Sequence, residues 1–317
     1  MKAVILAGGL GTRLRPLTYT VPKPLIPLVG KPLIVRIIES LPNSVDTVIL
    51  AVSYMREALE DYFRVHSCGR KLIIVNEPSP LGTGGAIKNV ASYLDETFIA
   101  LNGDCISSLD LRSMVKKHRE CGGIGTIALW RVEDPSAYGV IQMDQNHRIL
   151  DFQEKPRREE AKSNLINAGY YVLEPEILDY IGKGPVSIER EVFPMVLDYG
   201  LFGHHFTGYW TDCGTRENFL AAQAKLLELE RPASSDSKGC YLAPSWVLSS
   251  NVKGAKIGPF ACIDAGVMVG EGAEVSYSLV MKGAAIGAGC IIRDSIIGPG
   301  YKVNENEKVE GAILANR

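Results

Sequence analysis

The chain opens with Met1-Lys-Ala-Val-Ile-Leu-Ala7 and runs directly into Gly8-Gly-Leu-Gly-Thr-Arg13. The apolar run from Ala3 to Ala7 is typical of a buried parallel strand. Glycines at 8, 9 and 11 let the backbone approach a ligand, because they carry no Cβ. Free N–H groups in such a loop form a nest for anions, and Thr12, Arg13 and Arg15 add a hydroxyl and two cations. The stretch therefore predicts a phosphate-binding loop at the end of a strand.

Spacing excludes two common phosphate loops. A dinucleotide fingerprint needs glycine where Leu14 stands, and a Walker loop needs a Gly-Lys-Ser/Thr sequence that is absent. Downstream, Pro22 and Pro24 bracket Lys23, and a residue before proline is expected to be extended. Cations cluster where phosphate charge must be met, which favours a binding role. The alternative is a tight turn followed by a proline-rich loop.

The stretch from Gly8 to Thr18, followed by Pro22-Lys-Pro-Leu25, resembles the signature of the sugar-1-phosphate nucleotidyltransferases, which make NDP-sugars. The resemblance implies a loop that wraps a nucleoside triphosphate. It also implies that Arg13 and Lys23 neutralise the phosphates and serve catalysis. The nucleotide-contacting positions that it implies here are Leu6, Ala7, Gly8, Gly9, Gly11, Thr12, Arg13 and Lys23.

Composition narrows the class of protein. A length of 317 residues suits two domains, and the net charge of −2 gives no footprint for nucleic acid or an anionic membrane. No apolar run is long enough to span a bilayer, and no signal peptide is recognisable. The seven cysteines contain no C-x-x-C pair, which argues against a zinc site and a disulfide framework. We expect a cytoplasmic protein, with Cys213 a reduced, packed thiol.

Apolar periodicity alternates along the first part of the chain between helix and strand. Helical spacing occurs at 33–41 and 56–66, and β-rich runs occur at 46–53 and 71–76. This predicts a Rossmann-like α/β fold, with a mixed, mostly parallel sheet and helices on both faces. Ligands on such sheets lie at the carboxyl ends of strands. The segments Gly8–Arg13, Glu77–Gly85 and Asn102–Asp104 should therefore meet at one edge.

Glu77 is the candidate reader of the nucleobase. In the resembling family, the stretch that matches Gly82-Thr-Gly-Gly-Ala86 packs against the base, so Gly82 and Thr83 are nucleotide-binding candidates. The residue that reads the base edge matches Glu77, and it is typically glutamine in uridylyl and thymidylyl enzymes. An ionised carboxylate only accepts hydrogen bonds, which suits the two adjacent donors of guanine. The alternative is an exposed glutamate at a strand end.

Two aspartates are candidate metal ligands. Asp104 follows the predicted strand 97–101, and Asp212 lies in Trp210-Thr-Asp-Cys-Gly-Thr215. The resemblance implies that both carboxylates bind metal and also that Asp104 contacts the nucleotide. Mg²⁺ prefers one or two carboxylates plus substrate phosphates. The convergence of two residues so far apart in sequence is a structural prediction, and a turn-forming Asn-Gly-Asp is the alternative for Asp104.

A predicted hairpin from 138 to 152 ends at Gln153-Glu-Lys-Pro156. The family has Glu-Lys-Pro here, and the resemblance makes Lys155 the catalytic residue that grips the sugar phosphate. Pro156 is expected to keep Lys155 extended. The resemblance also implies sugar contacts for Gly139, Glu154 and Asn167. The alternative for the two charged residues is a surface ion pair of little energetic value.

The segment Ser187-Ile-Glu-Arg-Glu-Val-Phe-Pro194 looks like the corresponding part of mannose-1-phosphate guanylyltransferases, and the alternative is an amphipathic helix. A helix is expected from Arg216 to near Arg231. The small, polar residues that follow predict a linker. The expected domains are a catalytic domain at 1–231, a linker at 232–240 and a C-terminal domain at 241–317.

Beyond the linker, aliphatic residues recur six apart: Ile257, Ile263, Val269, Val275 and Met281, then, after single-residue slips, Ile286, Ile292, Ile297, Val303 and Val309. This period predicts a parallel β-helix, and it resembles the left-handed hexapeptide β-helix that many of these enzymes carry. We expect roughly three coils, docked on the catalytic domain or on another subunit. The last histidine is His205, which excludes a histidine-based acyltransferase in this segment.

Two classes of function remain. The first is an Mg²⁺-dependent enzyme that joins GTP to mannose 1-phosphate and releases pyrophosphate, with a uridylyl- or thymidylyltransferase acting on glucose 1-phosphate as the runner-up. The second is a non-catalytic regulatory subunit that binds sugar nucleotides. The presence of Arg13, Lys23, Asp104, Lys155 and Asp212 favours the enzyme. Its partners are the two small-molecule substrates, and we expect a homo-oligomer formed through the β-helix.

Overall fold

The computed structural model describes residues 1–230, 240–241, 244–248, 250–252 and 254–316. The chain forms two compact units. The first contains Met1–Gly9 and Ile37–Trp210, and the second contains Leu10–Arg36 and Thr211–Arg317. The predicted linker at 232–240 lies, except for its last residue, outside the described residues. The predicted domain boundaries differ from this division, because the segment 10–36 groups with the C-terminal part of the chain.

The first unit is built on a nine-stranded sheet with the order β10-β9-β11-β6-β1-β4-β5, in which β8 pairs with β11 and β12. The strands β1, β4, β5 and β6 pair in parallel, as do β8 and β12, whereas β9, β10 and β11 add antiparallel pairs. This confirms the mixed, mostly parallel fold. The strands are β1 (Lys2–Leu6), β4 (Thr47–Val52), β5 (Lys71–Asn76), β6 (Phe98–Asn102), β8 (Gly125–Arg131), β9 (Gly139–Met143), β10 (Ile149–Glu154), β11 (Leu165–Leu173) and β12 (Leu201–His205), with the short β7 (Cys105–Ser107) beyond β6.

Helices connect several of these strands, and α1 and α2 confirm the helical spacing predicted at 33–41 and 56–66. They are α1 (Leu33–Ser40), which crosses the boundary of the units, α2 (Arg56–Val65), α3 (Gly82–Asn89), α4 (Leu111–Cys121) and the short α5 (Phe193–Met195), which follows a π-helical turn at Ile188–Val192. Asp110 caps α4 by accepting a hydrogen bond of 3.1 Å from the Arg112 N–H, which satisfies a donor that the first turn leaves open. Among the described residues, no helix combines the length and the apolar character needed to cross a bilayer.

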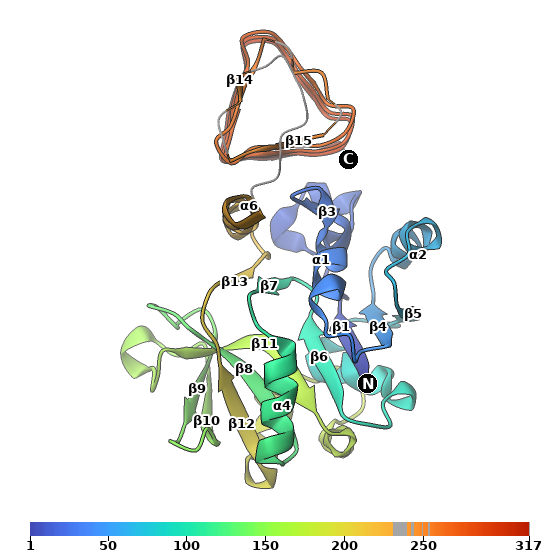
Figure 1. The fold of residues 1–317 in the computed structure, drawn as a ribbon, viewed down its shortest axis with the longest axis vertical. Helices are drawn as coiled ribbons and strands as arrows, with labels where there is room; N and C mark the ends of the chain where they lie inside the picture. The colour runs from blue at the N-terminus through green and yellow to red at the C-terminus, as the bar shows by residue number, and fades with distance from the viewer. Residues whose placement is uncertain (231–239, 242–243, 249, 253, 317) are drawn as a thin grey trace. The chain divides into compact units, whose positions relative to one another are not determined.

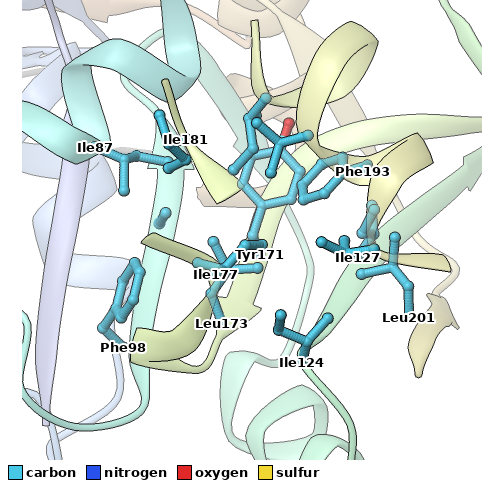
Figure 2. Packing of buried hydrophobic residues seen from close by; sticks show 14 of the residues in the cluster. Ile87, Phe98, Ile124, Ile127, Tyr171, Leu173, Ile177, Ile181, Phe193 and Leu201 are labelled. Carbon is cyan, nitrogen blue, oxygen red and sulfur yellow. The ribbon is translucent and has the colours of Figure 1, made fainter. Parts of the chain in front are cut away.

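The core of the first unit gathers around Tyr171 of β11, whose side chain is fully buried (Figure 2). Its ring lies 5.3 Å from the ring of Phe193, and Ile127, Ile177 and Leu173 belong to the same buried cluster. A buried tyrosine hydroxyl needs a hydrogen-bonding partner. The partners of this hydroxyl belong to the candidate site described below, so the core and the site share one residue.

The second unit combines the phosphate-loop segment with the C-terminal domain. Its N-terminal part contains three 3-10 turns, at Thr12–Leu14, Leu17–Tyr19 and Lys23–Leu25, and the hairpin of β2 (Pro27–Leu28) and β3 (Lys31–Pro32). The helix α6 (Arg216–Glu230) packs against β2, and the Gln223 side chain donates hydrogen bonds of 3.0 Å to two β-helix carbonyls, those of Phe260 and Ser278. The β-helix therefore docks on segments of the predicted catalytic domain.

Three parallel sheets form the faces of the β-helix, which has a triangular cross-section (Figure 1). The first face contains β14 (Cys240–Tyr241), β16 (Lys256–Ile257), β19 (Glu274–Ser276), β22 (Ile291–Arg293) and β25 (Lys308–Glu310). The second contains β15 (Trp246–Val247), β17 (Cys262–Ile263), β20 (Leu279–Val280), β23 (Ile296–Ile297) and β26 (Ile313–Leu314), and the third contains β18 (Met268–Val269), β21 (Ala285–Ile286) and β24 (Lys302–Val303). The two five-stranded faces make the domain longer than the predicted three coils, because the inner residues Val247, Val252 and Ile257 are five apart and so fall outside the six-residue repeat.

One predicted inward residue of the β-helix is wrong. Val280, and not Met281, pairs in register with Ile263 and Ile297, and Val280 belongs to the buried cluster inside the coils. The single-residue slip in the repeat therefore comes before this strand and not after it. The other predicted aliphatic residues all lie in the inner cluster, which confirms the hexapeptide pattern.

Candidate active site

The carboxyl ends of β1, β5 and β6 carry three predicted site segments in the first unit. Leu6 of β1 pairs with Asn102 of β6, and the Gly103 N–H donates a hydrogen bond of 2.9 Å to the Leu6 carbonyl. Gly8 and Asp104 therefore leave neighbouring strands at the same edge, and Glu77 reaches this edge from β5. The structure confirms that the parts of these segments in the first unit meet.

The Glu77 carboxylate lies against the start of the glycine loop. Its side chain is buried, with 6% of the residue exposed. A Cβ added to Gly8 would lie 2.6 Å from the Glu77 Oε1, so only glycine leaves room for the carboxylate here. The Leu81 N–H donates a hydrogen bond of 3.3 Å to the other oxygen. Burial raises the pKa of Glu77 and this hydrogen bond partly offsets the rise, because burial penalises the charged form.

The raised pKa of Glu77 predicts how the thermal stability of the protein depends on pH. A carboxyl whose pKa is higher in the folded chain stabilises the fold at low pH and loses that contribution as pH rises through its folded pKa. In the absence of nucleotide, Glu77→Gln should therefore unfold at a higher temperature than the wild type at pH 7. The difference in unfolding temperature should shrink as the pH falls toward 4.5, the usual pKa of a glutamate. Thermal unfolding of both proteins between pH 4 and pH 8 tests this, and a constant difference across the range would contradict it.

A cavity of about 700 Å³ lies in the first unit beside the antiparallel strands β9, β10 and β11. It brings together six residues that the sequence analysis selected: Gly82, Thr83, Gly139, Glu154, Lys155 and Asn167. Gly82 and Thr83, which were expected to contact the nucleotide, also line this cavity, because the start of α3 forms part of its wall. The cavity walls carry both carboxylates and cations, which suits a ligand with hydroxyls and a phosphate.

Glu189 at the wall of this cavity is a residue that the sequence analysis did not select. Its carboxylate accepts hydrogen bonds from the hydroxyls of Thr83 at 2.5 Å, Ser187 at 2.8 Å and Tyr171 at 3.0 Å. Burial and the neighbouring Glu189 carboxylate raise the pKa of Tyr171 well above its usual value, so its hydroxyl stays protonated and donates. The sequence analysis had noted the motif from Ser187 to Pro194, which contains Glu189, but only the fold shows that Glu189 lines the cavity.

The polar groups of Asn167 and Glu154 are partly engaged within the protein. Asn167 accepts a hydrogen bond of 2.9 Å from the Gly169 N–H and donates one of 2.9 Å to the Tyr171 hydroxyl. Because an amide nitrogen carries two N–H donors, a second one exists for a ligand hydroxyl. The Glu154 carboxylate accepts from Arg190 at 2.8 Å, and its other oxygen would lie 3.3 Å from a Cβ at Gly139. The alternative considered for Glu154 was an ion pair with Lys155, whereas the structure pairs Glu154 with Arg190.

Neither Lys23 nor Lys155 has the extended backbone that the following proline predicts. Lys155 has a left-handed backbone with φ of 48°, and its N–H donates to the Tyr138 carbonyl at 3.0 Å, just beyond the Glu154–Gly139 pair at the open end of the β9–β10 hairpin. Lys23 begins a 3-10 turn, in which its carbonyl accepts from the Ile26 N–H at 3.1 Å. These hydrogen bonds, together with the burial of Lys23 and Pro24, outweigh the local preference for extended backbone.

The second unit carries the other predicted phosphate and metal ligands. A Cβ added to Gly214 would lie 2.7 Å from the Asp212 Oδ1 and would overlap the Arg13 guanidinium, so these two side chains flank the same glycine. Lys23 is buried, and Gly11 packs against it and against Thr18, whose hydroxyl donates to the Gly11 carbonyl at 2.9 Å. Arg13, Lys23 and Asp212 are thus parts of one compact unit. Thr12 begins the 3-10 turn beside them.

Asp104 belongs to the first unit and Asp212 to the second, so their convergence stays a prediction. Both are carboxylates, which are hard oxygen donors of the kind that a divalent cation bound to phosphates requires. The Cys213 thiol is fully buried and is in no disulfide, as expected of a packed thiol. The donor set therefore fits a hard divalent cation and not a soft metal bound by thiolates.

Comparison with known proteins decides the family. A model of the nucleotidyl transferase family matches residues 2–229, and a model of the GMPPB C-terminal domain matches residues 240–317. This chain belongs to the nucleotidyl transferase family. It is a nucleotidyltransferase, as the opening motif predicts, and the C-terminal match covers the β-helix.

Named relatives of this nucleotidyltransferase share most of its length. It is 37% identical to the mannose-1-phosphate guanylyltransferase of Mycobacterium tuberculosis, over 92% of this chain and 82% of the relative. It is 35% identical to mannose-1-phosphate guanylyltransferase 1 of Arabidopsis thaliana, over 99% of this chain and 90% of the relative. The crystal structure of HddC from Yersinia pseudotuberculosis complexed with GMP-PN is 30% identical, with a TM-score of 0.61 over 71% of this chain and 99% of HddC.

Proposed function

We propose that this nucleotidyltransferase joins GTP to mannose 1-phosphate, forming GDP-mannose and pyrophosphate. The observation that carries the choice of nucleotide is the buried Glu77 carboxylate against Gly8. A carboxylate accepts from the N1–H and 2-amino groups of guanine and repels the carbonyls that flank the single donor of uracil or thymine. The names of the relatives support GTP and mannose 1-phosphate as substrates. The runner-up, a uridylyl- or thymidylyltransferase for glucose 1-phosphate, is disfavoured by this carboxylate.

The proposal assigns one site to the sugar phosphate and another to the triphosphate. The cavity with Gly139, Glu154, Lys155 and Asn167 takes the sugar phosphate. The segments at the ends of β1, β5 and β6 and the loop from Gly11 to Lys23 take the triphosphate. The full nucleotide set in this proposal is Leu6, Ala7, Gly8, Gly9, Gly11, Thr12, Arg13, Lys23, Glu77, Gly82, Thr83 and Asp104. Mg²⁺ is the proposed metal, with Asp104 and Asp212 as its protein ligands.

The reaction needs no covalent enzyme intermediate. An oxygen of the sugar phosphate is already an anion and attacks the α-phosphorus of GTP, while the bond to pyrophosphate breaks on the opposite side. Catalysis then consists of positioning and charge stabilisation. Lys155 orients the attacking phosphate, and Arg13 and Lys23 stabilise the charge that develops on the leaving pyrophosphate. Bound Mg²⁺ would supply further charge neutralisation between the phosphates.

The proposal is tested by measuring pyrophosphate release with GTP, UTP, dTTP and ATP, each combined with mannose 1-phosphate and glucose 1-phosphate in the presence of Mg²⁺. We expect release to be fastest with GTP and mannose 1-phosphate. Faster release with UTP or dTTP would contradict the role of Glu77. No release with any pair from folded protein would favour the non-catalytic regulatory subunit.

The Arg190–Glu154 pair predicts a small effect on sugar binding. Arg190 orients the Glu154 carboxylate over Gly139, and more than half of the Arg190 side chain is exposed. Because exposed pairs are worth less than about 1 kcal/mol, Arg190→Ala should raise the KM for mannose 1-phosphate by about threefold to fivefold. The KM for GTP should not change. Arg64→Ala, which removes an exposed arginine of α2, is the matched control. An unchanged KM for the sugar phosphate would contradict this role.

The proposal also includes a homo-oligomer formed through the β-helix and a cytoplasmic location. In the described part of the chain, no disulfide joins any of the cysteines Cys68, Cys105, Cys121, Cys213, Cys262 and Cys290, which supports a reducing compartment. Size-exclusion chromatography with light scattering, on the full chain and on the chain cut after residue 230, tests the oligomer. If the full chain and the shortened chain contain the same number of subunits per particle, assembly through the β-helix is contradicted.

A further inference from the structure

The turn between β2 and β3 has a strained backbone. Pro27 pairs with Pro32 and Leu28 with Lys31, which leaves Val29 and Gly30 as the two loop residues. Both have a left-handed backbone, with φ of 48° at Val29 and 76° at Gly30. Two-residue hairpin loops use this geometry, but a β-branched residue such as valine rarely adopts it. Such strain persists only where the surroundings impose it, and it marks places where position matters.

The surroundings that impose this geometry come from the β-helix and α6. Trp246 of β15 lies against Gly30, since a Cβ there would come within 2.8 Å of three atoms of the indole ring. Cys262, the register partner of Trp246 in β17, has its thiol close enough to the Val29 backbone for that backbone to lower the thiol pKa, against the larger effect of burial. One face of the β-helix thus covers the turn through two adjacent strands.

Arg36 secures the turn from the other side. Its side chain is 11% exposed and donates to the Leu28 carbonyl and, at 2.9 Å, to the Val29 carbonyl. The same guanidinium pairs with both carboxylate oxygens of Glu230 at the end of α6, at 2.5 and 3.2 Å. A two-pronged pair of this kind restricts orientation as well as adding energy. The turn therefore cannot shift without breaking contacts to α6 or to the β-helix.

The turn is connected to Lys23 by a short, hydrogen-bonded segment. The 3-10 turn that begins at Lys23 ends at Leu25, and the Ile26 N–H donates to the Lys23 carbonyl at 3.1 Å. The Ile26 carbonyl in turn accepts from the Leu33 N–H at 3.1 Å, just beyond the hairpin. Lys23 itself is buried and packs beside Gly11. A displacement of the hairpin is therefore transmitted to Lys23.

We propose that Trp246 is a positioning residue for the triphosphate site: by covering the Val29–Gly30 turn, the β-helix sets the position of Lys23. This inference rests on the proposed function, because it requires a triphosphate bound at Lys23. Every described residue that lines the proposed sugar-phosphate cavity belongs to the first unit. The inference therefore predicts a selective effect, in which loss of the indole weakens triphosphate binding and leaves the sugar-phosphate cavity intact.

The test compares Trp246→Ala, Trp246→Phe and Gly30→Ala with the wild type in the full chain. The Kd of GTP is measured by calorimetry, and the KM for mannose 1-phosphate is measured at saturating GTP. We expect the Kd of GTP to rise about tenfold in Trp246→Ala and in Gly30→Ala, since small displacements of binding groups are costly. Trp246→Phe should recover most of the affinity. The KM for mannose 1-phosphate should stay within twofold of the wild-type value.

The control is Met268→Ala, which removes an exposed side chain from another face of the same β-helix and should change neither constant. Wild-type affinity for GTP in Trp246→Ala would overturn the inference, as would equal weakening of both substrates together with a lower Tm. If Trp246→Ala does not fold, Gly30→Ala decides the question by the same two constants. Absence of GTP binding in the wild type would instead refute the proposed function.

Discussion

Asp212→Asn should release pyrophosphate about a hundredfold to a thousandfold more slowly than the wild type, with little change in thermal unfolding. The carboxylate lies beside Arg13 at Gly214, in the unit that also carries Lys23. Removing it would take away a negative oxygen ligand for the proposed Mg²⁺, and Arg13 and Lys23 would not supply the charge neutralisation that is lost with the cation. The change keeps the shape of the side chain, so an effect on turnover reports charge rather than packing.

The measurement is the rate of pyrophosphate release with saturating GTP, mannose 1-phosphate and Mg²⁺. Asp104→Asn should show a loss of similar size, because both carboxylates are proposed to serve one cation. The matched control is Asp61→Asn, which alters an exposed carboxylate of α2 and should leave the rate unchanged. Wild-type turnover in Asp212→Asn would refute the proposed metal site.

Glu77→Gln should lower the kcat/KM for GTP by about a hundredfold and reduce the preference for GTP over UTP. The buried carboxylate matches two guanine donors, whereas an amide presents one acceptor and one donor group and leaves a guanine donor facing its own N–H₂. A buried mismatch of this kind costs more than the loss of an exposed hydrogen bond. The raised pKa of Glu77 adds a pH effect, because protonation at low pH also removes an acceptor.

The measurement is kcat/KM for GTP and for UTP, from pH 5 to pH 8, at a fixed concentration of mannose 1-phosphate. Wild-type kcat/KM for GTP should fall as the pH drops, and this fall should be smaller in Glu77→Gln. Glu57→Gln, at an exposed position of α2, serves as the control. An unchanged ratio of GTP to UTP activity in Glu77→Gln would show that Glu77 does not contact the base.

Local sequence determined most of the elements of the first unit. The β-rich run at 71–76 became β5 with the same bounds, and the helical spacing from Arg56 became α2, because apolar periodicity reports directly which face an element buries. The six-residue repeat determined the β-helix for the same reason. The position of its slip was misjudged at Met281, because Val280 and Met281 are both apolar and both buried.

Tertiary structure decided what local rules could not. Lys23 and Lys155 depart from the extended backbone that a following proline favours, because backbone hydrogen bonds to Ile26 and Tyr138 outweigh that preference. Glu189 acquired its three hydroxyl partners from α3, β11 and its own turn, and no spacing in the sequence relates them.

The contact of Trp246 with Gly30 joins residues that are more than two hundred positions apart. The opening sequence by itself identified the nucleotidyltransferase family and predicted a phosphate loop, since glycine spacing and cations carry that chemistry locally. Only the packed chain decided that the Val29–Gly30 turn, which follows this loop, lies against the C-terminal β-helix. Packing between distant segments depends on the shapes of both surfaces, and neither segment encodes the other.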